Sequence, residues 1–118
     1  MVSLVPSDFA GGVPVDGYGP GFFRVAGRVH RGAVIVAAGG ARDWAGLGDA
    51  PALLALAGSV DVLFLGMGAD VALPPRELVA ALEAAGIMPE PMATPSAARS
   101  YNVTLSEGRR VACALLPI

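Results

Sequence analysis

Lysine is absent from this chain of 118 residues, and all eight of its basic residues are arginines. Ten acidic residues bring the formal net charge to −2, so the chain carries no excess of positive charge. A protein without a basic field has little with which to hold a phosphate backbone. We therefore expect no nucleic acid among its partners.

Cysteine and histidine are almost absent as well. The chain has one of each, Cys113 and His30, whereas a structural zinc ion usually takes four such ligands. We therefore expect no metal site and no cofactor. Cys113 lies in the apolar run VACALL, where a cysteine usually behaves as a small core residue. A lone cysteine cannot form an intramolecular disulfide, which favours a reducing, cytoplasmic location.

Long apolar runs are missing, although 54% of the residues are hydrophobic and the mean hydropathy is +0.62. A transmembrane helix needs roughly 18 or more uninterrupted apolar residues. The longest run covers residues 50–60 and is closed by Asp49 and Asp61. We therefore predict no transmembrane segment. The N-terminal residues also lack the basic region of a signal peptide, since the first arginine is Arg24.

The first half of the chain predicts a β-hairpin after an irregular arm. Residues 1–21 form the expected arm, because their last part reads DGYGPG and is dense in turn formers. Apolar and polar residues then alternate over 23–30, which is typical of a half-solvated strand. A continuous apolar strand follows at 33–38, and Arg31-Gly32 between the two favours a tight turn. We predict that these two strands pair.

The second half of the chain alternates helices and strands. Asp49 can cap the first helix, Pro74-Pro75 opens the second, and Thr94 with Pro95 reads as the N-cap and first residue of the third. Prolines within the second strand favour an edge position for it. The alternation predicts parallel strands with helices packed on the sheet. The expected ranges are helices at about 50–57, 75–85 and 95–103, and strands at 60–65, 87–92 and 109–116.

A candidate ligand site lies where the central strand ends. Ligands of α/β sheets favour this edge, and Gly66 and Gly68 would let backbone amides approach a small anion. The amides of the helix that begins at Thr94 form a second anion-binding candidate, to which Arg99 could add charge. The glycines can equally form a plain tight turn, and Thr94 an ordinary cap.

Residues at four other places along the chain complete the list of candidates. Asp70 follows the glycine loop, and Tyr101-Asn102 lies near the end of the third helix. Arg109 and Arg110 open the last strand, so that one of them could enter a cleft while the other is solvated. Trp44 is either a packing lid or an interface anchor. The candidate ligand or partner cleft thus comprises Gly66, Gly68, Asp70, Thr94, Arg99, Tyr101, Asn102 and Arg109, with Trp44 as the interface candidate.

Several segments, taken in their order, carry a family resemblance. They include Gly17-Tyr18-Gly19, Leu65-Gly66-Met67-Gly68, Met92-Ala93-Thr94, Tyr101-Asn102 and the stretch from Glu107 to Val111. Together they resemble a family of small domains that includes mitochondrial complex I assembly factor three and many bacterial and archaeal proteins of unassigned function. The family's usual G-T-G is here Gly66-Met67-Gly68, which puts any role of a hydroxyl in that loop in doubt.

The resemblance implies a compact three-layer α/β domain. With the pattern above, this gives one domain over residues 1–118, with a mixed sheet and an N-terminal β-hairpin followed by αβαβαβ. The mitochondrial member resembles a non-enzymatic helper that assembles a membrane respiratory complex with protein partners. We expect no catalytic residues, and we favour an interaction or assembly module whose partners include membrane-complex components. The alternatives are a binder of a small anion or metabolite, with or without catalysis, and a self-associating homodimer.

Overall fold

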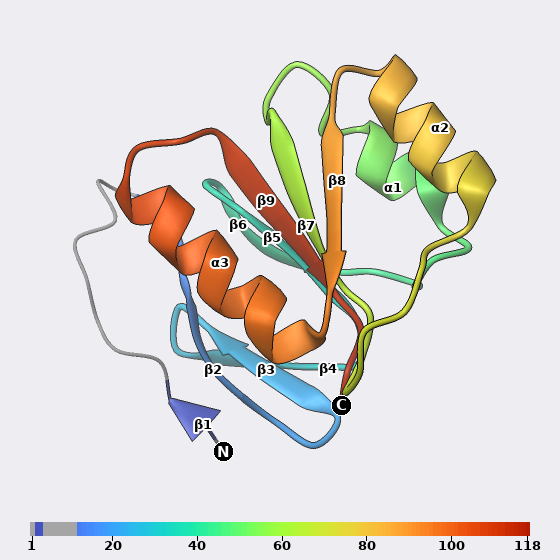
Figure 1. Cartoon of the computed structure of the whole chain (residues 1–118). Helices are drawn as coiled ribbons and strands as arrows, with labels where there is room; N and C mark the ends of the chain where they lie inside the picture. The colour runs from blue at the N-terminus through green and yellow to red at the C-terminus, as the bar shows by residue number, and fades with distance from the viewer. Residues whose placement is uncertain (1, 4–11) are drawn as a thin grey trace.

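A mixed five-stranded sheet forms the centre of the molecule (Figure 1). The structure is a computed structural model, and it describes residues 2–3 and 12–118. The strands of this sheet are β5 (Val34–Ala37), β6 (Gly40–Asp43), β7 (Val62–Gly66), β8 (Met88–Met92) and β9 (Val111–Leu115). They follow the order β6-β5-β9-β7-β8, in which β7 runs parallel to β8 and β9, while β5 runs antiparallel to β6 and β9. The mixed sheet and the edge position of β8 are confirmed.

Three helices cover the two faces of this sheet. They are α1 (Ala50–Leu54), α2 (Arg76–Ala84) and α3 (Thr94–Ser106), so that the predicted αβαβαβ order is confirmed. Side chains alternate along β7: Leu63 and Leu65 pack in the core with α1 and α2, whereas Phe64 packs in the core with α3. None of the helices in the described part of the chain is both long enough and apolar enough to cross a membrane.

Local signals set the helix ends much as expected. The side chain of Asp49 accepts a hydrogen bond from the amide of Ala52 at 3.4 Å and so caps α1. Helix α2 begins after Pro75 and ends just before Gly86, whose φ of +82° is the left-handed conformation that stops a helix. Helix α2 therefore ends where the chain changes conformation at Gly86.

A second, antiparallel sheet forms the third layer. Its strands, in order across the sheet, are β1 (Val2–Ser3), β2 (Val15–Gly19), β3 (Phe22–Val25) and β4 (Arg28–Arg31). Tyr18, Phe23 and Val25 belong to the same core cluster as α3, so this sheet lies on the α3 side of the molecule. The three-layer α/β architecture is therefore present: α1 with α2, the mixed sheet, and α3 with the small sheet.

The expectation of an irregular arm is wrong at residues 15–19, which form β2. Glycine here serves close packing within a strand: a Cβ on Gly19 would lie 2.5 Å from the ring of Phe22. The turn formers act one step later, at Pro20 and Gly21 between β2 and β3. Residues 2–3 of the expected arm form β1, which also departs from the prediction, while residues 1 and 4–11 lie outside the described part of the chain.

The predicted hairpin around Arg31-Gly32 is also wrong. Strand β3 pairs instead with β4 across a two-residue turn at Ala26-Gly27, and β5 pairs with β6 in the other sheet. Both turn residues have positive φ, 52° for Ala26 and 77° for Gly27, as a tight hairpin turn requires. The alternating pattern over 23–30 conceals this turn because Gly27 falls on the apolar phase of a single long strand.

Candidate functional site

The loop of Gly66 and Gly68 lies against the start of α3, as the sequence predicted. Their polar groups, however, bond to each other and to the chain after β9, and are not free for a ligand. The hydroxyl of Thr94 accepts a hydrogen bond from the Gly68 amide at 2.9 Å and donates one to the Leu116 carbonyl at 2.7 Å. The Thr94 amide in turn donates to the Gly68 carbonyl at 2.8 Å. Thr94 is fully buried. Two of the amides on which the predicted anion site relied are therefore used inside the fold.

Thr94 is not the N-cap of α3, which corrects the prediction. The cap position is Ala93, and Thr94 is the first residue inside the helix. Its hydroxyl turns toward Gly68 and Leu116 because the end of β7 lies directly against it. Gly66 at that end has no room for a side chain, since a Cβ there would lie 2.8 Å from the Thr94 hydroxyl oxygen. The junction thus joins β7, α3 and the chain after β9.

Replacing Thr94 with valine should lower the free energy of unfolding by about 2 kcal/mol, because the change leaves the Gly68 amide and the Leu116 carbonyl without their partner. Urea titrations followed by the fluorescence of Trp44, the only tryptophan, measure the loss. Thr94→Ser keeps the hydroxyl and is the matched control, with a loss of about 1 kcal/mol for the missing methyl group. Equal losses in both variants would contradict a role for the hydroxyl.

Tyr101 and Asn102 face the small sheet from α3. The amide of Asn102 exchanges two hydrogen bonds with the backbone of Val15, each 2.9 Å long, as a neighbouring strand would. The phenol of Tyr101 donates to the Val13 carbonyl at 2.6 Å. Both side chains are buried. These contacts fasten α3 to β2 and to the residues before it, so the structure places this pair inside the fold and not in a cleft.

Cys113 lies in the core between the mixed sheet and α3 and has no exposed surface. Burial raises the pKa of its thiol, and burial likewise raises the pKa of the Tyr101 phenol, with a smaller contribution from Cys113. Both groups therefore stay neutral near pH 7. The structure agrees with the interpretation of Cys113 as a core residue.

The protein should lose stability in alkali, because unfolding releases the protons of Cys113 and Tyr101. Their raised pKa values keep both protonated in the folded state, so their contribution is complete at neutral pH. It is lost as the pH rises past about 8.5 for an unfolded thiol and about 10 for an unfolded phenol, by about 1.4 kcal/mol per pH unit and group. Urea titrations between pH 7 and pH 11 measure the slope. Cys113→Ala should reduce it, and an unchanged slope would contradict this origin.

Two further candidates lie apart from these contacts. Trp44 is only 5% exposed and packs with α1 and α2, while its indole N–H donates to the Asp49 carbonyl at 3.3 Å. The packing role is therefore the one that the geometry favours for it. Asp70 is exposed in the segment between β7 and α2. Within the described residues, no group of three or more histidine, cysteine or acidic side chains could hold a metal ion.

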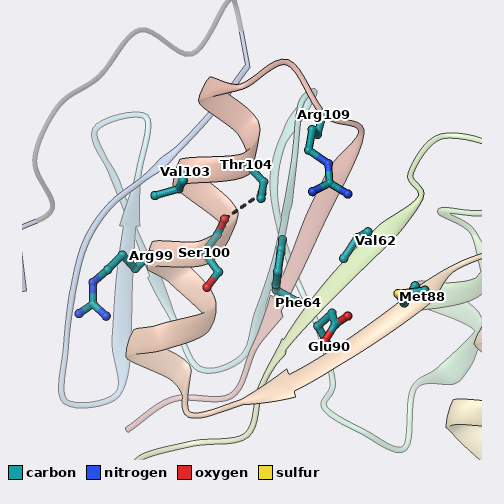
Figure 2. Close-up of a pocket in the computed structure, with 9 residues that line it drawn as sticks. All are labelled: Val62, Phe64, Met88, Glu90, Arg99, Ser100, Val103, Thr104 and Arg109. Carbon is teal, nitrogen blue, oxygen red and sulfur yellow. Dashed lines mark hydrogen bonds between the residues drawn. The ribbon is translucent and has the colours of Figure 1, made fainter.

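Arg99 and Arg109 lead to a different site, a groove of about 420 Å³ between α3 and the strands β7 and β8 (Figure 2). Figure 2 shows the Arg109 guanidinium pointing toward Val62 and Phe64, whereas that of Arg99 extends away on the other side of α3. Arg110 pairs instead with Asp61 at 3.2 Å. The groove is lined by Val62, Phe64, Met88, Glu90, Arg99, Ser100, Val103, Thr104 and Arg109.

The groove is mostly apolar, although hydroxyl groups line it. Thr104 donates its hydroxyl to the Ser100 carbonyl at 2.8 Å (Figure 2), and Ser100 donates to the sulfur of Met92 at 3.6 Å. Met88 is 57% exposed and Val103 is 52% exposed, so large apolar side chains meet solvent at its margins. The groove therefore presents apolar surface and charged groups, with its hydroxyls already bonded within the protein.

Sequence reasoning missed the apolar part of this groove. A signal existed on the third helix: its buried residues Ala97, Ala98, Tyr101 and Leu105 share one face, which leaves Val103 on another. Val62, Phe64 and Met88 carried no such signal, because apolar residues in a strand normally indicate core.

Comparisons with known proteins place the chain among relatives. A family model described as a protein of unknown function (DUF498/DUF598) matches residues 15–116. An uncharacterised protein of Rhodobacter capsulatus is 62% identical over 110 residues, which are 93% of this chain and 89% of that protein. A crystal structure described as an outer membrane protein of Bartonella henselae is 34% identical, with a TM-score of 0.81 over 91% of this chain and 96% of that one.

A solution structure from Bordetella pertussis, described as a Mth938-like domain, is 28% identical, with a TM-score of 0.76 over 99% of this chain and 92% of that one. The family match runs from β2 to the residue after β9 and so includes the mixed sheet, the three helices α1, α2 and α3, and strands β2, β3 and β4 of the small sheet. These findings agree with the resemblance noted in the sequence. The chain belongs to the DUF498/DUF598 family of proteins of unknown function, whose solved relatives include a Mth938-like domain.

Proposed function

We propose that this protein is a non-enzymatic interaction module that binds a protein partner in the groove beside α3. The observation that carries the proposal is the pair of large apolar side chains at its margins, Met88 at 57% and Val103 at 52% exposed. Exposed apolar surface gathered in one hollow is typical of interaction sites. Arg109 and Glu90 add charged groups that can orient a partner.

The chemistry of the buried groups supports binding over catalysis. Raised pKa values keep the Tyr101 phenol and the Cys113 thiol neutral, and both lie in the core rather than in the groove. Within the groove, the hydroxyls of Ser100 and Thr104 are bonded to the protein. A nucleophile needs a neighbouring base that can take its proton, but the hydroxyls of Ser100 and Thr104 form no hydrogen bond with Glu90, the carboxylate that lines the groove.

The partner that we favour is a component of a membrane complex, which the protein would help to assemble from the cytoplasmic side. One solved relative is described as an outer membrane protein, and the family resemblance points to a helper of respiratory-complex assembly. Membrane-complex subunits expose apolar helices before they are assembled, and such helices need a temporary apolar surface. The proposed role supplies that surface.

Purification of the tagged protein from detergent-solubilised cells tests this function. The wild type should retain specific membrane-complex or assembly components, and Val103→Glu should lose them at least roughly tenfold, because a charge then enters the apolar groove. Val29→Glu is the matched control, since Val29 is 55% exposed on β4, away from the groove. If no membrane-complex or assembly component is retained, or if all three proteins retain equal amounts, the result would count against the proposal.

A small-anion or metabolite binder remains the second candidate, on the strength of Arg109. Its guanidinium points into the groove and forms no ion pair within residues 12–118. Titration with phosphate and with small carboxylates, followed by NMR, tests this candidate directly. Saturable binding below about 1 mM that Arg109→Gln abolishes would favour the small ligand, whereas shifts without saturation would exclude it.

A further inference from the structure

The two faces of the mixed sheet are covered unequally. Helices α1 and α2 lie side by side over one face. On the other face, α3 and the small sheet cover β5, β9 and part of β7. A strip formed by Val62 and Phe64 of β7 with Met88 and Glu90 of β8 remains as the floor and far wall of the groove. This strip lies where a second helix would lie if the two faces matched.

The adjacent sheet edge cannot readily accept another strand. The Met88 amide donates to the Asp61 carbonyl, and the Met92 carbonyl accepts from the Met67 amide, so residues 88, 90 and 92 direct their backbone groups toward β7. Pro89 and Pro91 therefore hold the alternate positions, whose backbone faces outward, and proline has no amide hydrogen to donate. A partner in the groove must satisfy its own backbone hydrogen bonds, as a helix does.

The flank of α3 suits helix packing. Arg99 with Val103, and Ser100 with Thr104, form two adjacent rows spaced by four residues, which are the ridges that helices interlock. Ser100 and Thr104 are small, and their hydroxyls already bond within the protein. A second helix can therefore approach closely without leaving these polar groups buried and unbonded. A single acyl chain would leave much of its surface in water here, because both margins are open at Met88 and Val103.

Charge fixes the remaining property of the partner. Arg109 points into the groove without an ion pair among the described residues, and Glu90 lines the opposite wall without pairing to it. Arg109 is exposed, so a carboxylate of the partner can reach it, and the pair gains strength where the docked partner excludes water from it. We infer that the groove holds an amphipathic helix of a protein partner, packed along α3, with an aspartate or glutamate placed against Arg109. This inference rests on the proposed function and names the class of partner segment.

Site-specific photo-cross-linking tests the inference in the cells from which the gene comes. A photoreactive phenylalanine analogue replaces Val103 in the groove, Val29 on β4, or Leu73 in the exposed segment between β7 and α2. The Val103 probe should cross-link to one segment of a partner, which mass spectrometry identifies. That segment should be helical, with apolar residues every three to four positions and an acidic residue. The Val29 probe should not reach it.

Exchanging the charges of Arg109 and of the partner's acidic residue is the decisive part of the experiment. Arg109→Glu should reduce the cross-linked yield roughly tenfold, and lysine at the partner's acidic position should restore it. A segment without the acidic residue, a cross-link to lipid or to a second copy, or no cross-link from Val103 would overturn the inference. A protein cross-linked from Leu73 but not from Val103 would overturn both the inference and the groove as the binding site, and would place a protein interaction on another surface. Thermal unfolding of each variant confirms that the loss is not one of folding.

Discussion

Replacing Asn102 with alanine should lower the free energy of unfolding by about 3 kcal/mol, the largest loss that we expect from a change at one helix position. The side chain holds both the amide and the carbonyl of Val15, each at 2.9 Å. Val15 is 1% exposed, so water cannot take over either bond. Two buried backbone groups would thus lose their partners at once, each at a cost of about 1–3 kcal/mol.

Equilibrium unfolding in urea measures this loss, and hydrogen exchange locates it. Amides of β2 and β3 should exchange faster in Asn102→Ala while those of β7 and β9 stay protected, because the lost bonds join α3 to the small sheet. Val103→Ala, one residue along and half exposed, is the control and should cost less than about 1 kcal/mol. Similar losses in both variants would show that helix propensity, not the bonds to Val15, decides the result.

Replacing Gly66 with alanine should cost about 3 kcal/mol. The new Cβ would lie 2.8 Å from the hydroxyl oxygen of Thr94 and 2.9 Å from both the Thr94 Cα and a methyl carbon of Leu115. One of these neighbours is backbone, so the start of α3 must move away from β7. Overpacking of this kind costs about 1–3 kcal/mol, and movement of Thr94 also strains its bonds to Gly68 and Leu116.

Gly48→Ala is the matched control for this change. A Cβ on Gly48 meets nothing within 4 Å, and the residue is exposed. Its unfolding free energy should stay within about 0.5 kcal/mol of the wild type. A double variant, Gly66→Ala with Thr94→Ala, should lose less than the sum of its two single changes, since Thr94→Ala removes the hydroxyl oxygen that the new Cβ would meet. Full additivity would indicate that Gly66 and Thr94 do not oppose each other as the geometry requires.

Much of the second half of the fold could be predicted because its signals are local. Asp49 caps a helix, Gly86 ends one, and prolines 89 and 91 place a strand at the sheet edge. The hairpin in the first half could not be placed, since its turn depends on Ala26 adopting a φ of 52°. An alanine rarely adopts a left-handed conformation, so the residue type does not predict this turn. The pairing of β5 with β6 and β9 is likewise a contact between distant segments.

The candidate site could be predicted only in part, for a related reason. Arg99 is a candidate because it follows the start of the third helix, and Arg109 because it opens the last strand; both line the groove. Gly66, Gly68 and Thr94 do come together, but which polar groups bond within the protein is decided by angles that a sequence does not show. Phe64 and Met88 look like any apolar strand residue, and only the packed structure shows which of them is covered.

The strand order has a consequence for synthesis. Strand β9 follows the other four strands of the mixed sheet in the sequence, yet it lies between β5 and β7 in the middle of the sheet. Until it leaves the ribosome, the pair β5-β6 and the pair β7-β8 have nothing to join them, and each exposes apolar edges. The sheet therefore closes only after β9 has been translated, by contacts distant in sequence that form slowly. A growing chain of this protein is most exposed to aggregation, and most in need of chaperones, just before β9 is made.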